Sequence, residues 1–160
     1  MPESLRSAPP TDPAAAGEAL ADAVARAMYP RDRASQLLGI RLLAVQPGYA
    51  RLTMTVRPDM VNGHHLCHGG LIFTLADSAF AYACNSTNQN TVASACHIDF
   101  LAPAHEGDIL EAEAIEQSLS GRTGVYDVTV RNRSGHNIAL FRGKSYRIKG
   151  EVIAGLAAAD

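Results

Sequence analysis

The chain has no excess of basic residues and contains no tryptophan. Lys and Arg together number 14, and Asp and Glu number 16, which gives a formal net charge of -2 over 160 residues. Nucleic-acid binding generally requires a basic surface or stripe, and this composition supplies none. With 47% hydrophobic and 19% charged residues, the chain has the profile of one ordinary globular domain, and nucleic acid is not an expected partner.

Long hydrophobic runs are also missing. No stretch reaches the roughly 18 apolar residues of a membrane span, and nothing near the N-terminus resembles a signal peptide. The three cysteines, Cys67, Cys84 and Cys96, are an odd number and lack the dense spacing of a disulfide scaffold. We therefore expect a soluble cytoplasmic protein without a membrane partner, in which all three cysteines are reduced.

Motifs of several common enzyme classes are absent. There is no Gly-x-Ser-x-Gly elbow, no Walker-type loop and no dinucleotide fingerprint. A zinc site could use His64, His65, Cys67 and His68, but it needs ligands from a second segment, and the Pro-Cys-x-x-Cys partner of the zinc deaminases is missing. A nucleophilic pair of Cys67 and His68 is an alternative, although catalytic pairs usually meet across the fold. No metal or redox cofactor is expected.

One stretch, residues 62–85, organises the rest of the chain and reads NGHHLCHGGLIFTLADSAFAYACN. Its second part, Leu71 to Cys84, is apolar or small on nearly every face, which is typical of a buried central helix. The only charge there is Asp77, and a carboxylate is rarely buried without a partner. Asp77 is therefore a candidate for catalysis, and the alternative is a structural Asp that pairs with a buried Arg or caps another element.

The remaining segments predict a single domain over residues 14–150, with tails at 1–13 and 151–160. Residues 14–28 and 31–38 have helical patterns, and the runs 40–45 and 49–56 predict a hairpin. Four more β-like runs follow the central helix, at residues 91–101, 109–117, 124–132 and 137–148. The expected fold class is α+β, an antiparallel sheet wrapped around the long central helix. Such a sheet leaves one β edge exposed, so we expect at least a homodimer.

Two further features of the sequence have candidate roles in binding. Gly69 and Gly70 allow close approach of a ligand, and the first N–H groups of a helix can hold an oxyanion, although a bare turn is an equal alternative. Phe73 and Phe80 flank Asp77 at helical spacing and are candidates for an acyl pocket, or else core residues. Arg142 and Lys144 share one strand face and are candidate phosphate contacts, whereas most of the other late cations are typical of solvated sheet.

The central stretch, followed by VASACHIDFLAP, GVYDVTV and ALFRGKSYRI, resembles the hotdog-fold acyl-CoA thioesterases, and specifically those of phenylacetic acid degradation. The resemblance runs from about Met28 to Gly150. It implies a hotdog fold, chains paired through their sheets, a site at the subunit interface and, by analogy, a homotetramer. It also implies that Gly69 supplies an oxyanion-hole N–H, that His68 positions Asn62, and that Asn62 and Asp77 hold the attacking water, unless Asp77 is itself the nucleophile.

The chain departs from the pattern expected of this family at two positions. His97 stands where a small hydroxyl residue is expected, and Ala102 stands where a basic residue is expected in the Phe-Leu-x-Pro turn. The expected function is hydrolysis of phenylacetyl-CoA or hydroxyphenylacetyl-CoA in phenylacetate catabolism, with acyl-CoA as the substrate. The alternatives are a non-catalytic acyl-CoA-binding module and a hotdog hydratase or dehydratase, because one fold hosts many functions.

Overall fold

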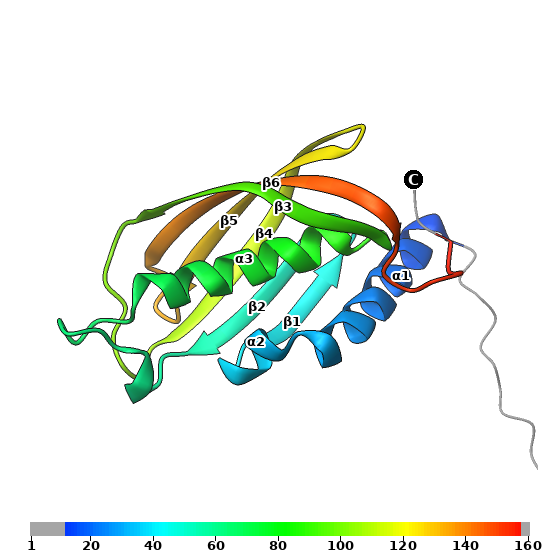
Figure 1. Ribbon diagram of the computed structural model, residues 1–160. Helices are drawn as coiled ribbons and strands as arrows, with labels where there is room; N and C mark the ends of the chain where they lie inside the picture. The colour runs from blue at the N-terminus through cyan, green and yellow to red at the C-terminus, as the bar shows by residue number, and fades with distance from the viewer. Residues whose placement is uncertain (1–11, 158–160) are drawn as a thin grey trace, which may run out of the picture.

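A computed structural model describes residues 12–157 of the chain. Six antiparallel strands form one sheet in the order β1-β2-β4-β5-β6-β3, and the long helix α3 lies in the hollow of this sheet (Figure 1). The helices are α1 (Pro13–Met28), α2 (Arg33–Leu37) and α3 (Gly69–Asn85), with short 3-10 turns η1 (Tyr29–Arg31) and η2 (Pro58–Met60). The strands are β1 (Arg41–Gln46), β2 (Tyr49–Thr55), β3 (Gln89–Phe100), β4 (Ile109–Ser120), β5 (Thr123–Asn132) and β6 (Asn137–Glu151). The predicted α+β hotdog architecture is confirmed.

The core lies between α3 and the concave face of the sheet. Leu75, Ala76 and Ala79 of the helix are fully buried, and they face inward-pointing strand residues such as Leu52 and Leu110. Burying apolar surface stabilises a fold by about 25 cal/mol per Å², so the apolar sequence of α3 is explained by its position. Asp77 is the only charged residue on this helix.

Several boundaries differ from the sequence prediction. Helix α1 begins at Pro13, one residue earlier than expected, because Asp12 Oδ1 accepts a hydrogen bond from Ala14 N at 3.1 Å and caps the helix. Strand β6 runs to Glu151, and Asn88 then bonds Ile153 through both its side-chain oxygen and its side-chain nitrogen. Residues 1–11 of the expected N-terminal tail and residues 158–160 of the expected C-terminal tail lie outside the described part of the chain.

The two edges of the sheet differ in their surroundings. Helix α1 packs against β1, whereas β3 pairs with β6 alone among the described strands and leaves a twelve-residue edge open. Val92, Phe100 and Leu101 at this edge are 45%, 52% and 52% exposed. An open apolar edge of this length is a surface that natural proteins normally cover. Within residues 12–157, no helix is long and apolar enough to cross a membrane.

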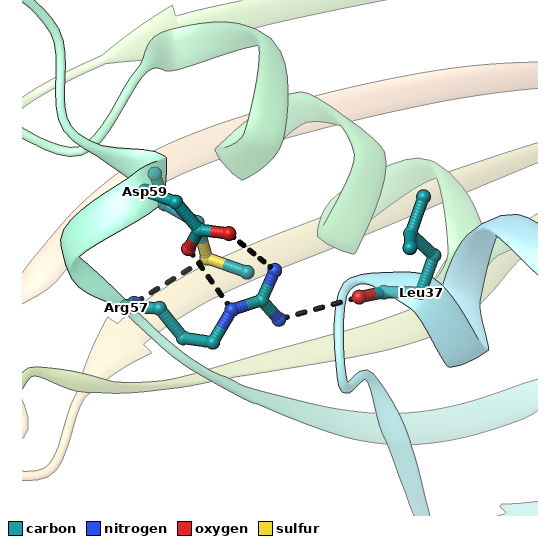
Figure 2. Close-up of polar contacts among 4 residues, drawn as sticks. Leu37, Arg57 and Asp59 are labelled. Atoms are coloured by element: carbon teal, nitrogen blue, oxygen red, sulfur yellow. Dashed lines mark hydrogen bonds and ion pairs between the residues drawn. The ribbon is translucent and has the colours of Figure 1, made fainter.

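A cluster around Arg57 anchors the connection between β2 and α3 (Figure 2). The guanidinium donates to Asp59 Oδ1 and Oδ2 at 3.0 and 3.2 Å and to the Leu37 carbonyl oxygen at 3.3 Å. Leu37 is the last residue of α2, where a cation is favourable for the helix dipole. The cluster therefore fixes the start of the loop that continues to Asn62.

Candidate active site

The loop before α3 is closed by the side chain of Asn62. Asn62 Oδ1 accepts hydrogen bonds from the backbone N–H groups of His64 (2.9 Å) and Leu66 (3.2 Å), and the Asn62 N–H donates to the Leu66 carbonyl oxygen at 2.7 Å. Because two N–H donors require an oxygen, the orientation of the amide is fixed. The Asn62 Nδ2 group has no hydrogen-bond acceptor among residues 12–157 and remains a donor for a ligand.

His68 directly precedes α3 and caps it. Its Nδ1 accepts a hydrogen bond from the Gly70 N–H at 3.1 Å, so the ring is an N-cap of the helix. Among residues 12–157, no hydrogen bond joins His68 to Asn62, and the positioning of Asn62 by His68 stays a prediction. The Gly69 N–H has no acceptor within the described chain, and it is therefore the donor that this helix start offers to an oxyanion.

A surface hollow of about 430 Å³ lies at this helix start. Its lining residues come from the loop, from α3 and from the segment after β3: Asn62, Leu66, Cys67, Gly69, Ile72 and residues 100–104. The Phe100 ring packs over Gly69, with its nearest atom 3.0 Å from the position that a Cβ on Gly69 would take. The structure thus brings Asn62 and Gly69 to one mostly apolar hollow and adds Phe100, which the sequence analysis did not name.

Asp77 is half-buried, and desolvation raises the pKa of its carboxyl group above the ordinary value. Within residues 12–157, no Arg or Lys forms an ion pair with it, so the alternative of a buried Asp–Arg pair has no support from these residues. Its hydrogen-bonding neighbour is the thiol of Cys96, 4.0 Å from Oδ1. A carboxylate in these surroundings is more basic than one in water, which suits a general base or a nucleophile.

The distance between Asp77 and the hollow decides whether one chain can form the whole site. Gly69 and Asp77 are eight residues apart on one helix, which corresponds to about 12 Å along its axis. Asp77 does not line the hollow at the helix start. One chain therefore unites Asn62 and Gly69 but does not bring its own Asp77 to them.

The two aromatic candidates have different surroundings. Phe80 is 1% exposed, and its ring lies against Tyr126, Phe141 and the backbone at Gly143, so it belongs to the core and has no surface for an acyl group. Its assignment as a substrate contact is corrected for this reason. Phe73 is half-buried and makes an edge-to-face contact with Phe141 at 5.4 Å between ring centroids.

The basic candidates on β6 lie on the other face of the sheet. Phe141 and Gly143 of this strand contact Phe80 of α3, and side chains alternate along a strand, so Arg142 and Lys144 point away from the helix. Arg142 also donates two hydrogen bonds to Asp127, at 2.6 and 2.7 Å. Neither cation lines the hollow at the helix start of the same chain, and their assignment as phosphate contacts stays a prediction.

The structure also bears on two alternatives from the sequence, a nucleophilic pair of Cys67 and His68 and a zinc site. Cys67 is buried, and burial together with the nearby Asp108 raises the pKa of its thiol, which disfavours a nucleophilic thiolate. Its sulfur contacts the His68 carbonyl oxygen and not the ring. No group of three or more His, Cys, Asp or Glu in residues 12–157 has the arrangement of a metal site. Cys96 was not predicted as a site residue, although Cys96, Ile98 and Phe100 alternate along one strand face.

Comparison with known proteins identifies the family. The thioesterase superfamily model matches residues 64–139. The acyl-coenzyme A thioesterase PaaI of Escherichia coli (strain K12) is 51% identical over 128 residues, covering 80% of this chain and 91% of that protein. The solved E. coli PaaI protein from the phenylacetic acid degradation operon has a TM-score of 0.83 and 49% identity, covering 84% of this chain and 98% of the other. The TT0310 protein from Thermus thermophilus has a TM-score of 0.71 and 41% identity, covering 74% of this chain and 99% of the other. The chain belongs to the thioesterase superfamily, as its sequence resemblance predicted.

Proposed function

We propose that the protein hydrolyses acyl-CoA thioesters to the free acid and CoA. The observation that carries this proposal is the Gly69 N–H, an unpartnered donor within the described chain at the positive end of α3 that faces an open, mostly apolar hollow. A thioester carbonyl placed there develops negative charge on its oxygen, and a preorganised N–H stabilises that charge. The E. coli relative, half of whose aligned residues are identical, is itself an acyl-coenzyme A thioesterase.

In this proposal, the Gly69 N–H stabilises the oxyanion and Asp77 provides the attack on the carbonyl carbon. As a general base, it takes a proton from water, the resulting hydroxide adds to the carbonyl carbon, and collapse breaks the C–S bond. The CoA thiolate then takes the proton from Asp77. As a nucleophile, Asp77 instead forms an acyl anhydride while the thiolate leaves, and water hydrolyses that anhydride. Both routes need no metal or redox cofactor.

The site is shared between two copies of the chain. The helix separates Gly69 from Asp77 of the same chain by about 12 Å, too far for both to act on one carbonyl carbon. The open edge of β3 is the surface through which a second copy pairs, and Phe100 and Leu101 at its end border the hollow. In such a dimer, Asn62 and Gly69 of one subunit meet Asp77 of the other.

Two dimers further associate into a tetramer in this proposal. The face of the sheet away from α3 exposes apolar side chains on β4 and β6, namely Ile115, Leu140, Tyr146 and Ile148, each between 42% and 48% exposed. Exposed apolar side chains on one face of a sheet favour association. The tetramer predicts a sedimentation mass of four chains at micromolar concentration, whereas a fully active monomer contradicts the shared site.

The acyl group is aromatic in this proposal, with phenylacetyl or hydroxyphenylacetyl as the leading candidates. The E. coli PaaI structure belongs to a protein of the phenylacetic acid degradation operon, which favours a role in phenylacetate catabolism. Of the two aromatic candidates, Phe73 keeps partial exposure. Contact between two aromatic rings adds about 0.5 to 1.5 kcal/mol beyond burial of area, which corresponds to a several-fold preference.

Measuring thiol release across an acyl-CoA panel tests both the thioesterase activity and the preference for an aromatic acyl group. We expect kcat/KM for phenylacetyl-CoA to exceed that for acetyl-CoA and for a long saturated acyl-CoA by several-fold to about 10². If kcat/KM for an aliphatic substrate equals that for phenylacetyl-CoA, the aromatic pocket is contradicted, but the thioesterase activity is not. Binding of acyl-CoA without turnover of any thioester supports the acyl-CoA-binding module instead, and addition of water to an enoyl-CoA supports the hydratase.

We also propose that the protein acts in the cytoplasm. All three cysteines are free in the structure, including the exposed Cys96, which is typical of a reducing compartment. Fractionation of cells followed by an assay of phenylacetyl-CoA hydrolysis tests this location.

A further inference from the structure

Cys96 lies directly against the carboxylate of Asp77. The thiol is 4.0 Å from Oδ1, within the range of a sulfur hydrogen bond, and no other hydrogen-bond donor to this carboxylate exists among residues 12–157. The second oxygen, Oδ2, has no donor within the same residues. Among the described residues, the carboxylate therefore has one hydrogen-bond donor, at Oδ1, and none at Oδ2.

The packing of β6 against α3 creates this contact. Cys96 pairs with Gly143 on β6, and a Cβ at Gly143 would lie 2.9 Å from the Phe80 ring. Because Gly143 has no side chain, Phe80 rests on the strand backbone and α3 approaches the β3–β6 pair closely. Asp77 precedes Phe80 by about one helical turn, so the same approach brings its carboxylate to Cys96.

We propose that Cys96 is a positioning residue for Asp77, whose thiol holds Oδ1 so that Oδ2 faces the water or the thioester. This inference rests on the proposed function, because it concerns the orientation of the group that performs the hydrolysis. A carboxylate on a freely rotating side chain spends part of its time in unproductive orientations, and fixing it raises kcat without changing binding of CoA.

The choice of a thiol has a chemical reason. An S–H group is a weak donor, so it orients the carboxylate while stabilising its charge little. A hydroxyl at the same position would be a stronger donor, which would lower the basicity of Asp77. The titratable groups that interact with Asp77 are the thiols of Cys84 on α3 and Cys96 on β3. Burial raises the pKa of Cys84 to about 12, and burial and the Asp77 charge raise the pKa of Cys96, so both are neutral donors near pH 7.

Two variants of Cys96 and one control test this role in the full-length oligomer. We expect Cys96→Ala to lower kcat by about 3- to 10-fold at an unchanged KM for phenylacetyl-CoA. We expect Cys96→Ser, which differs by one atom, to recover most of kcat and to move the acid limb of the pH profile to lower pH. Cys84→Ala is the matched control, since the Cys84 thiol is neutral near pH 7 and gives its hydrogen bond to the Ala81 carbonyl oxygen. It should leave the pH profile in place.

Titration of the Asp77 side-chain carboxyl by carbon NMR gives a readout that does not depend on turnover. The pKa of Asp77 should increase in the order Cys96→Ser, wild type, Cys96→Ala. Identical titration of all three proteins, or a loss of kcat in both variants without any shift of the acid limb, overturns the proposal. Should Asp77→Asn retain parental turnover while the titration order holds, the catalytic role of Asp77 fails and the hydrogen bond alone stands.

Discussion

The ring of Phe100 lies 3.0 Å from the position that a Cβ on Gly69 would occupy. The close neighbour of Gly69 is thus a side chain, and the backbone there does not itself require glycine, because the φ of Gly69 is not in the left-handed region. Phe100 is half-exposed at the end of β3, so its ring can yield by a few tenths of an ångström. We expect Gly69→Ala to fold with an unchanged or higher Tm, because Ala favours a helix over Gly.

Activity should respond differently to the same substitution. The new methyl group occupies the space beside the Gly69 N–H, where the thioester oxygen must sit, and we expect kcat/KM to fall by about 10². Gly63→Ala is the control, since a Cβ there has no atom within 4 Å. Loss of activity in both variants to the same degree would show that the loop, and not the Gly69 N–H, is responsible.

Asp77 should limit stability at neutral pH. Burial raises the pKa of its carboxyl group in the folded state, so the stabilising protonated form is fully present below the unfolded pKa and is lost as pH rises through the folded pKa. We expect Asp77→Asn to have a higher Tm than wild type at pH 7, with the difference vanishing near pH 3, and to lose about 10² or more in kcat.

Glu18→Gln removes the same charge from the exposed surface of α1 and serves as the comparison. Parallel melting curves of the three proteins between pH 3 and pH 8 provide the measurement. A lower Tm for Asp77→Asn at pH 7 would mean that the carboxylate stabilises the fold, contrary to the desolvation argument.

His68 should contribute to stability as a helix cap. Its Nδ1 accepts the Gly70 N–H, and loss of an N-cap acceptor typically costs about 1 kcal/mol. We expect His68→Ala to lower the free energy of unfolding by that amount and His68→Asn, which keeps an acceptor, to restore most of it. Urea unfolding of the three proteins measures the difference. Equal stability of the Ala and Asn variants would exclude the cap.

Phe73 and Phe80 should separate specificity from stability. Phe80 is enclosed by the core, so Phe80→Leu should lower the free energy of unfolding by about 1 to 3 kcal/mol and leave the ratio of phenylacetyl-CoA to acetyl-CoA activity unchanged. Phe73→Leu should lower that ratio several-fold. The assay is kcat/KM for both substrates. If the activity ratio changes in the Phe80 variant and not in the Phe73 variant, Phe80 is the residue that sets specificity.

The fold was largely predictable because its signals are local. The apolar run from Leu71 to Cys84 admits only a buried helix, and the hairpin turns at Gly48 and Gly121 take positive φ values that favour glycine. The helix start at Gly69 and the buried carboxylate of Asp77 follow from the same stretch. These features required no knowledge of which segments meet in space.

The surroundings of the aromatic and basic candidates depend on contacts between distant segments. The outer face of β6 carries Leu140, Tyr146 and Ile148 as well as Arg142, so alternation alone does not reveal which face meets α3. Phe80 and Phe73 lie on similar helix faces, and the difference arises from the surroundings of Phe80, which packs against Tyr126, Phe141 and the backbone at Gly143. The roles of Cys96 and Phe100 likewise arise where β3 meets α3.

The central claim is that Asp77 of one subunit acts with Asn62 and Gly69 of another. Asn62→Asp keeps the Oδ1 acceptor that closes the loop and removes the amide donor, so it disables the hollow without opening the loop. Asp77→Asn removes the carboxylate that the other subunit contributes to the same site. Each variant alone should be nearly inactive on phenylacetyl-CoA.

The decisive measurement is the thioesterase activity of the two variants co-expressed in equal amounts. Random pairing makes half of the dimers hybrid, and each hybrid has one site with both defects and one intact site. The shared site predicts recovery to about one quarter of the wild-type kcat per chain, by this count of intact sites. Activity that stays at the sum of the two inactive variants, in a mixture shown by mass spectrometry to contain hybrids, would contradict a site built from two subunits.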